Sequence, residues 1–569
     1  MTESPSIDQP PGRIPWWREP SLLAVILLAA FTYFARLYAL PLFGEEPRRA
    51  LIAREMVETG DWIVPTTQGV LLLSRPPLQN WLIAITGLAV GSIDVIATRL
   101  PSILSTIAVT IMIYGYLRQR NTKLGSTAGA VSFATMLLVM EFARSGETEA
   151  VFTVFVAASM LLWHWGWMAK WPAWQMWSIG YACAALGMLT KGLQAPVYFA
   201  GSAGIFLVLT GNWRHLLTRG HLIGIAVFLL VFGAWQAPFT WMRGIEESWM
   251  MFFGDVAGRF VDRRWSTFLS HLVAYPVELL CVRLMPWSVL LLAFANRHVR
   301  SKLGERRETA LFMTICILFS FVFVWLPPGS KVRYYMPLFP NFAVLIGIAV
   351  DCLAAEMKDR GWGSLWKTFV RAHVALMLGT AVIVLIVSLV KPSAWISLPL
   401  LPAFGFTIVT AWLAFVTQRS LSEPIDRGMA RGVYGIGIFL ALVQIGLITT
   451  VQEHRCQDIA GPIQQLKQTL PAGTKLVSLG LVHHAFAFFY QQPIPIVEMP
   501  VTKLPEGVEY FCLHTYATDP PELPFEWKQL AVINCDRFQS EGVPKDRVFI
   551  GHYTPAENVE PKRDSVPAE

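Results

Sequence analysis

The chain alternates long apolar runs with short polar segments. A run of about 20 apolar residues can cross the hydrocarbon core of a bilayer as a helix. The runs are continuous rather than alternating, so we expect helices and not the strands of a barrel. Thirteen membrane spans are predicted, near residues 21–42, 95–117, 125–143, 148–168, 173–190, 193–210, 221–240, 272–296, 309–327, 335–354, 371–390, 396–417 and 432–451. The run 80–92 is too short to cross comfortably and predicts an interfacial helix.

Positive charge is concentrated in alternate loops. These basic segments contain Arg118, Arg120 and Lys123; Arg214 and Arg219; Arg297, Arg300, Lys302, Arg306 and Arg307; Lys358, Arg360, Lys367 and Arg371; and Arg419, Arg427 and Arg431. Because Lys and Arg enrich cytoplasmic loops, these segments are predicted to lie inside. Arg13 and Arg18 place the N-terminus there too, and an odd number of spans then places everything after residue 451 outside.

Composition agrees with a multi-pass protein of the plasma (inner) membrane. The 569 residues are 54% hydrophobic and 15% charged, whereas soluble proteins carry about 25% charged residues. The net charge of +7 follows from the basic inner loops. Nucleic acid binding is a poor interpretation because no basic run is interleaved with stacking aromatics.

The composition changes after the last apolar run. Helices are predicted over 459–470 and 483–490, and strands over 476–479, 509–513, 530–534 and 548–551. This alternation predicts a small α/β domain. The predicted organisation is a cytoplasmic tail 1–20, a transmembrane domain 21–451 with an external loop 43–81, an extracytoplasmic α/β domain 452–553 and a disordered tail 554–569.

The predicted outer side collects the polar segments that suggest chemistry. They are 43–81, 144–149, 190–192, 241–271 and 330–335. Nothing in the apolar pattern requires these segments to share a face. Their common side therefore predicts an active-site cavity there.

The positions of the cysteines and the absence of nucleotide-binding motifs narrow the range of possible functions. Cys183, Cys281, Cys316 and Cys352 fall in or at spans and are interpreted as packing residues. An oxidising compartment would permit one disulfide among Cys456, Cys512 and Cys535. The sequence has no CxxC, no P-loop and no GxGxxG opening a helix, which argues against an ATP-driven pump. His483 and His484 are interpreted as surface or packing residues rather than ligands.

The segment 43–81 carries a family resemblance. It contains, in order, Glu45-Glu46-Pro47-Arg48-Arg49-Ala50, Ala53-Arg54-Glu55-Met56, Gly60-Asp61-Trp62-Ile63-Val64-Pro65 and Arg75-Pro76-Pro77. It resembles the first external loop of the aminoarabinose-transferase and protein O-mannosyltransferase group of GT-C membrane glycosyltransferases. Glu45 stands where that group has an aspartate, and Arg75 where it has a lysine. Charge is kept in both, while reach and geometry change.

The resemblance implies an all-α polytopic GT-C protein with the C-terminal α/β domain. It also implies transfer of a sugar, with inversion, from a polyprenyl-phosphate donor to a lipid, glycan or protein acceptor at the outer face of the cell envelope. Sugar transfer to a hydroxyl needs a carboxylate that takes the acceptor proton. The resemblance assigns this role to Glu45, with Glu46 orienting it or helping to hold a cation. Glu149, beside Glu147, matches the second acidic motif of the group.

Several cations are candidates for the donor phosphate. They are Arg75, Lys191, Lys331 and Arg333, with Tyr334 beside the last, and Arg48 is a candidate partner of the acids. Lys and Arg neutralise the charge that develops on a departing phosphate. The alternative for the cations is that they snorkel to lipid head groups. For Glu147 and Glu149 the alternative is that acids favour the start of a helix.

Cofactor and class remain open at this point. Some members of the group hold a divalent metal near the acids, and Glu45, Glu46 and Glu149 would hold it here. The sequence neither requires nor excludes a metal. A transporter or flippase of lipid-linked sugars would share the spans and the cations, but would not need the outer acidic pair. Discontinuous spans and an internal repeat would favour transport, and no clear repeat is seen. A structural membrane protein with a binding module is the third alternative.

Overall fold

A computed structural model describes residues 15–258, 265–327, 329–361, 363–391, 396–471, 473–501, 503–517, 519, 521–539 and 544–553. It divides into two compact units. Unit 1 comprises Met1–Ala39 and Leu73–Val451, and unit 2 comprises Leu40–Leu72 and Gln452–Glu569. The tail 554–569, most of the N-terminal tail, and Arg259, Asp262, Arg263 and Arg264 of the predicted outer loop lie outside the described residues.

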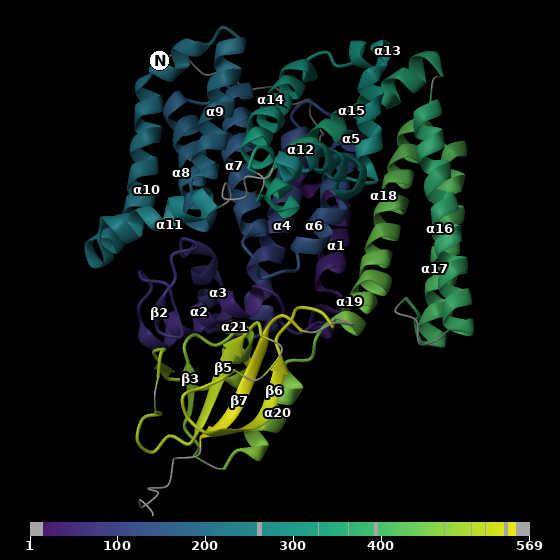
Figure 1. Cartoon of the computed structure of the whole chain (residues 1–569). Helices are drawn as coiled ribbons and strands as arrows, with labels where there is room; N and C mark the ends of the chain where they lie inside the picture. The colour runs from purple at the N-terminus through teal and green to yellow at the C-terminus, as the bar shows by residue number, and fades with distance from the viewer. Residues whose placement is uncertain are drawn as a thin grey trace, which may run out of the picture. The chain divides into compact units, whose positions relative to one another are not determined.

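Unit 1 is helical (Figure 1). Its helices are α1 (Pro20–Phe34), α3 (Leu78–Val90), α4 (Val95–Leu117), α5 (Lys123–Thr135), α6 (Leu137–Phe142), α7 (Glu149–Met168), α8 (Ala173–Lys191), α9 (Gln194–Leu209), α10 (Arg219–Arg243), α11 (Ile245–Gly258), α12 (Trp265–Glu278), α13 (Arg297–Ser301), α14 (Arg306–Trp325), α15 (Phe339–Arg360), α16 (Ser364–Val390), α17 (Leu400–Arg419) and α18 (Ile425–Val443). Helix α19 (Thr449–Arg455) continues from α18 through a π-helical turn and ends in unit 2.

The centre of unit 1 is built on close contact between α5 and α15. A Cβ atom placed on Gly347 would lie 2.6 Å from the carbonyl oxygen of Gly125, and one on Gly129 would lie 2.9 Å from that of Ala343. Small residues four positions apart let helix backbones approach this closely in membranes. Helix α15 is correspondingly buried along most of its length.

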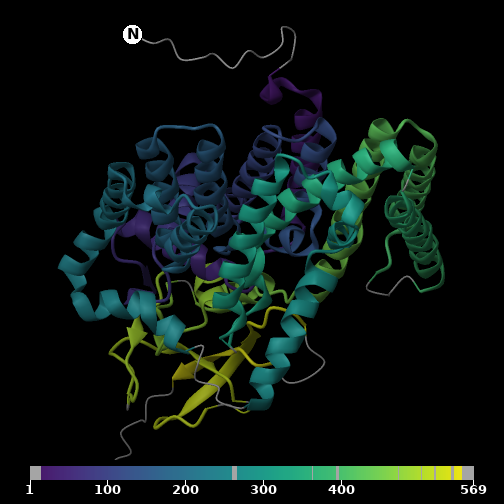
Figure 2. The same cartoon turned by 90° about the horizontal axis from the view of Figure 1, so that it is seen from above.

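Helices α16 and α17 run beside each other at the edge of unit 1 in both views (Figures 1 and 2). Their outward side chains are large and apolar, including Leu401 and Trp412, which are 84% and 62% exposed. Such a surface is costly in water but matches lipid tails. This part of unit 1 is therefore suited to a bilayer.

Ten helices among the described residues are long and apolar enough to cross a membrane, and they overlap ten of the thirteen predicted spans. The predicted span 272–296 is matched only in its first half, by Trp265–Arg283, because its second half is a separate 3₁₀ helix, Trp287–Ala295. The predicted span 125–143 is two helices, because the chain turns to an extended conformation at Met136. Helix α9 is too short, and α8 forms over the predicted range 173–190 but is not among the ten. The predicted outer loop 241–271 is also largely helical, as α11 and the start of α12.

The predicted basic loops gather at one end of unit 1. Arg120 pairs with Glu308 at 2.9 Å, and Glu308 also accepts a hydrogen bond from Trp167. Further ion pairs join Arg306 to Asp351, Lys302 to Asp359 and Lys358 to Asp426. The ring of His215 contacts that of Trp167. All five basic segments predicted for the inner side therefore lie at this basic end.

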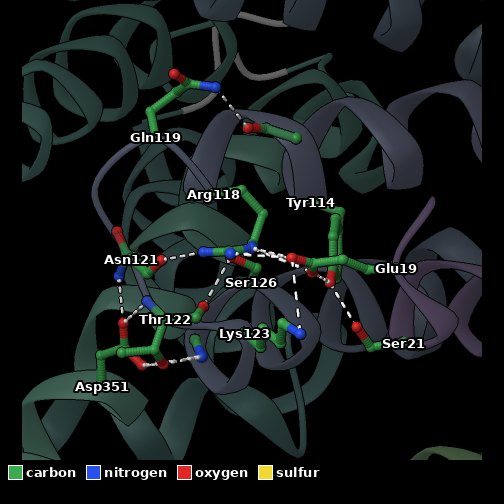
Figure 3. A network of polar contacts seen from close by, with 12 residues as sticks. Glu19, Ser21, Tyr114, Arg118, Gln119, Asn121, Thr122, Lys123, Ser126 and Asp351 are labelled. Carbon is green, nitrogen blue, oxygen red and sulfur yellow. Dashed lines mark hydrogen bonds and ion pairs between the residues drawn. The ribbon is translucent and has the colours of Figure 1, made fainter. Parts of the chain in front are cut away.

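Two buried carboxylates organise the basic end (Figure 3). Glu19 accepts from Tyr114 and pairs with Arg118 Nη2 at 3.0 Å. Asp351 of α15 accepts from the backbone N–H of Thr122 at 2.8 Å and of Gly125 at 2.9 Å. Both donors lie at the start of α5, where backbone N–H groups have no partner within the helix, so Asp351 caps that helix from a neighbouring one, together with the N-cap side chain of Thr122.

Helix α7 gives the distance from the basic end to the opposite end. Trp167, which contacts Glu308, follows Glu149 by eighteen residues along this helix. At 1.5 Å per residue this separation is about 27 Å. That is close to the hydrocarbon thickness of about 30 Å. Glu149 therefore lies at the end of unit 1 opposite the basic loops.

Unit 2 contains the expected α/β part. Its elements are α2 (Glu46–Thr59), β1 (Thr66–Thr67), β2 (Val70–Leu71), α20 (Ala460–Thr469), β3 (Leu476–Leu479), α21 (His484–Tyr490), β4 (Ile496–Val497), β5 (Tyr510–Thr515), β6 (Trp527–Asn534) and β7 (Arg547–Tyr553). The sheet order is β4-β3-β5-β7-β6, parallel over the first three strands and antiparallel over the rest. Phe511, Val477 and Leu479 form its core. The four predicted strands are confirmed, and the two-residue β4 was not predicted.

The segment 40–72 folds with the C-terminal part of unit 2. The side-chain amide of Gln68 exchanges two hydrogen bonds with the backbone of Val482. Arg54 donates to the carbonyl oxygen of Phe488 and lies 4.5 Å from the centre of its ring. The described residues contain no disulfide, so the bond permitted among Cys456, Cys512 and Cys535 is not formed.

Candidate active site

A buried cluster of charges forms at the end of unit 1 opposite the basic loops. Lys191, the last residue of α8, places its Nζ 2.9 Å from Oε1 of Glu149 in the first turn of α7. Their side chains are 2% and 3% exposed. Arg333, in the 3₁₀ helix Val332–Leu338, places its Nε 3.3 Å from the same carboxylate oxygen and pairs with Glu147. We call Glu147, Glu149, Lys191 and Arg333 the buried charge cluster.

Aromatic rings line this cluster. The Nζ of Lys191 lies 4.4 Å from the ring centre of Tyr334 and 5.7 Å from that of Phe152. The guanidinium of Arg333 lies 5.9 Å from the ring centres of Tyr334 and Phe142. Ring faces attract cations, so these contacts hold the two positive groups in place without neutralising them.

The helix dipoles stabilise the charges of Glu149 and Lys191 at the positions these residues occupy. Glu149 lies at the positive N-terminal end of α7, and Lys191 at the negative C-terminal end of α8. Glu149 thus stands in the first turn of α7, as the helix-start alternative expected, and also pairs with Lys191; its role as the second acidic motif stays a prediction. Burying several ionised groups at a membrane boundary still costs free energy, so their retention points to a function.

Arg75 adds a third cation to the two carboxylates and two cations of the cluster. It precedes α3, and its positive charge acts on both Glu149 and Lys191. Three cations beside aromatic rings suit the binding of an anionic group.

Lys331 differs from the other predicted cations. Its side chain is exposed, and it forms no ion pair with any residue that the structure describes. The structure therefore does not bring Lys331 into the buried charge cluster. A role for it in phosphate binding stays a prediction.

Two amides that sequence analysis did not single out lie just after Arg75. Gln79 donates to the carbonyl oxygen of Gly146 at 3.2 Å, which ties α3 to the acidic segment. Asn80 is fully buried, and within the described part of the chain its side-chain oxygen and nitrogen have no hydrogen-bond partner. Such atoms are costly unless something pairs with them. The sequence offered one sign that these two amides belong to the site, namely that they closely follow the motif Arg75-Pro76-Pro77.

The acidic pair lies in unit 2, at the start of α2. Glu46 is 1% exposed, and its Oε2 accepts a hydrogen bond from the backbone N–H of Phe43 at 3.2 Å. The Glu45 side chain is 36% exposed and pairs with Nη1 of Arg48 at 2.9 Å. Arg48 is therefore an ion-pair partner of the acids, as the sequence suggested. Of the two carboxylates, Glu45 is the one open to an acceptor.

The metal interpretation finds no matching ligand set. In the described ranges no three His, Cys, Asp or Glu side chains gather closely enough to hold a metal ion. Glu149 is instead engaged by Lys191 and Arg333, and Glu46 by its own turn. We derive no step through a metal.

Comparisons with known proteins agree with this architecture. Residues 74–236 match the family model described as dolichyl-phosphate-mannose-protein mannosyltransferase. The chain is 25% identical over 474 residues to an undecaprenyl phosphate-alpha-4-amino-4-deoxy-L-arabinose arabinosyl transferase of Pseudomonas fluorescens, covering 78% of this chain and 75% of the relative. It is 28% identical over 345 residues to an enzyme of that description from Pseudomonas aeruginosa, covering 57% and 59%.

Solved structures show the same fold. The crystal structure of ArnT from Cupriavidus metallidurans bound to undecaprenyl phosphate superposes with a TM-score of 0.68 at 17% identity, covering 93% of this chain and 97% of that one. Its apo state gives a TM-score of 0.65. The predicted fold class, a polytopic helical GT-C protein with a small C-terminal α/β part, is confirmed. None of these matches supports the transporter alternative.

Proposed function

We propose that this polytopic membrane glycosyltransferase of the GT-C fold moves a sugar from a polyprenyl-phosphate donor to an acceptor at the extracytoplasmic face, with inversion. The relatives named for undecaprenyl phosphate-linked aminoarabinose support that class of donor. A lipid acceptor is the first candidate, and a glycan or a protein is the alternative. Aminoarabinose is the first sugar to test.

The observation that carries this proposal is the buried charge cluster. When the bond between the sugar C1 and the phosphate oxygen breaks, the phosphate leaves with the electron pair and gains negative charge. Lys191 and Arg333 are held by rings and carboxylates at one end of the bundle, where such a group from a membrane lipid would arrive. Preorganised cations of this kind stabilise developing charge in a water-poor site. Glu149 keeps them aligned.

The acceptor side of the reaction is assigned to the acidic pair. Glu45 takes the proton of the acceptor hydroxyl as its oxygen bonds to C1 from the face opposite the leaving phosphate. The partial exposure of Glu45 supports this role, and the burial of Glu46 in its own turn supports an orienting one. A phosphate acceptor, already ionised at neutral pH, would need no base.

The proposal that the reaction takes place at the extracytoplasmic face rests on how the positive charges are distributed over unit 1. All five basic segments lie at one end of unit 1, and the buried charge cluster lies at the other. By the positive-inside rule the basic end faces the cytoplasm. The extracytoplasmic placement of 452–553 is part of this proposal.

The proposal is tested with purified protein in vesicles and a radiolabelled polyprenyl-phosphate sugar, aminoarabinose first and mannose second. Lipid A, peptide and glycan acceptors are offered separately, and donor binding and transfer are measured independently. We expect transfer to one acceptor class. Lipid-linked sugar that crosses the bilayer without transfer from any donor would refute the proposal and favour a flippase.

A further inference from the structure

Three histidines gather in unit 2 next to the start of α2. The rings of His483 and His484 lie 4.2 Å apart between centres, and those of His483 and His514 lie 5.3 Å apart. The Nε2 of His514 lies 3.2 Å from Oδ1 of Asp546. Nothing in the proposed reaction yet uses this group, although it touches the segment that carries Glu45.

His484 makes two contacts with that segment, and each specifies one ring nitrogen. Its Nε2 lies 2.8 Å from the carbonyl oxygen of Gly44, which can only accept, so Nε2 carries the proton. Its Nδ1 lies 3.4 Å from Nη2 of Arg48, which can only donate, so Nδ1 presents its lone pair. The two partners together select one neutral tautomer of the imidazole.

The two residues that His484 contacts, Gly44 and Arg48, stand on either side of Glu45 in the sequence. Gly44 immediately precedes Glu45 and has a φ of +64°, a conformation that glycine adopts at little cost, so the direction of its carbonyl is set by this turn. Arg48 is one turn further along α2, and its Nη1 holds the Glu45 carboxylate at 2.9 Å. His484 therefore fixes the backbone before the carboxylate and the cation that pairs with it.

The surroundings keep His484 neutral. The charged or titratable groups around it are Arg48 and Glu45 from α2, His483 from the turn before α21, and Asp546 beside β7. Burial and the Arg48 guanidinium lower the pKa of His484 to about 4. Protonation would place an Nδ1–H against a guanidinium, so the pair of contacts exists only with the neutral ring.

We propose that His484 is a positioning residue for the Glu45 carboxylate, acting through Gly44 and Arg48. This inference rests on the proposed function, in which Glu45 takes the acceptor proton. His484 itself exchanges no proton and forms no bond with substrate. Its role is to hold the carboxylate in one orientation, and a misplacement of about 1 Å can cost up to about a hundredfold in rate.

The first test separates positioning from donor binding. We expect His484→Ala to lower kcat roughly ten- to a hundredfold while KM for the polyprenyl-phosphate donor stays unchanged, because the buried charge cluster is not touched. His484→Gln can still donate to Gly44 and should regain part of the rate. His552→Ala, at a half-buried histidine of the same unit that faces Glu509, is the matched control and should leave the rate unchanged.

The second test asks whether the effect passes through Glu45. In a Glu45→Gln background, which has no carboxylate to position, His484→Ala should slow transfer no further, whereas independent effects would multiply. A multiplicative loss would overturn the inference and make His484 a packing residue. If His484→Ala does not fold, the same comparison is made with His484→Gln, which should likewise slow transfer no further in the Glu45→Gln background.

The outcomes distinguish the inference from the function on which it rests. A slow Glu45→Gln together with an unmodified rate for His484→Ala and His484→Gln removes only the positioning role. An unmodified rate for Glu45→Gln removes the base and its positioning residue together. Absence of transfer by the intact protein removes the proposed function.

Discussion

Removing the Lys191 ammonium is the most direct perturbation of the proposed donor site. Lys191→Ala breaks the 2.9 Å pair with Glu149, in which both side chains are almost fully buried. Losing a charge-assisted contact to phosphate costs about 1.5–3 kcal/mol. At 1.4 kcal/mol per tenfold change, donor affinity should fall by roughly ten- to a hundredfold.

Lys191→Ala also affects folding, and the structure allows that part to be separated. Breaking one side of a buried ion pair costs about 3–5 kcal/mol. Because Arg333 remains 3.3 Å from the same oxygen of Glu149, we expect the lower end, about 3 kcal/mol. The double variant Glu149→Gln with Lys191→Gln leaves no unpaired buried charge. It should recover most of the stability but not the donor affinity.

The assay is binding of labelled polyprenyl phosphate to purified protein in detergent, beside the midpoint of thermal unfolding. Lys358→Ala, which removes an exposed lysine at the basic end, is the matched control and should change neither quantity. If the double variant binds the donor as the unmodified protein does, Lys191 is not a phosphate ligand. Its role would then be structural.

Three further predictions address the reaction, the topology and pH. Glu45→Gln should lower transfer to a hydroxyl acceptor by about a hundred- to ten-thousandfold while donor binding persists; an unmodified rate would point to Glu46, Glu149 or a phosphate acceptor. A reporter fused after residue 455 should be active outside the cytoplasm and one fused after residue 303 inside, and the reverse pattern would overturn the proposed sides. His484 has its pKa lowered to about 4, against about 6.5 when unfolded, so the unfolded chain binds the extra proton first. The neutral ring therefore contributes at most about 3 kcal/mol to the free energy of unfolding, fully above about pH 6.5 and less as pH falls toward 4. The thermal midpoint should drop less between pH 7.5 and pH 5 in His484→Phe than in the unmodified protein, and an equal drop would contradict the assignment.

Much of the fold could be predicted from local patterns in the sequence. Ten of the predicted spans follow from runs of apolar residues alone, because a helix in lipid satisfies its own backbone and needs only length and hydrophobicity. The end of α2 was also predictable, since Gly60 adopts a left-handed φ of +74° that stops the helix. The strands of unit 2 follow from short β-rich runs between turn residues. Each of these features depends on neighbours along the chain.

Where helices are interrupted, the local pattern was insufficient. The apolar run 125–143 has neither a charge nor a proline at Met136 to mark the break that separates α5 from α6, and its one charged residue, Glu141, lies within α6. The segment 241–271 contains charges typical of a loop, but its apolar residues, such as Trp249 and Phe253, support the helix α11. In both places the sequence permits more than one conformation, and the pattern of apolar and charged residues alone does not choose between them.

The candidate site shows the same division. The residue types were evident from the sequence: acids in 43–81 and 147–149, and cations at 75, 191 and 333. Only the tertiary structure decided that Lys191 and Arg333 share Glu149, that Lys331 stays apart from them, and that Asn80 is buried without a partner in the described chain. The same holds for His484, which lies 440 residues beyond Gly44 and was interpreted as a surface or packing residue. Contacts between such distant positions leave no periodic signal in a single sequence, because they are set by how the whole chain closes on itself.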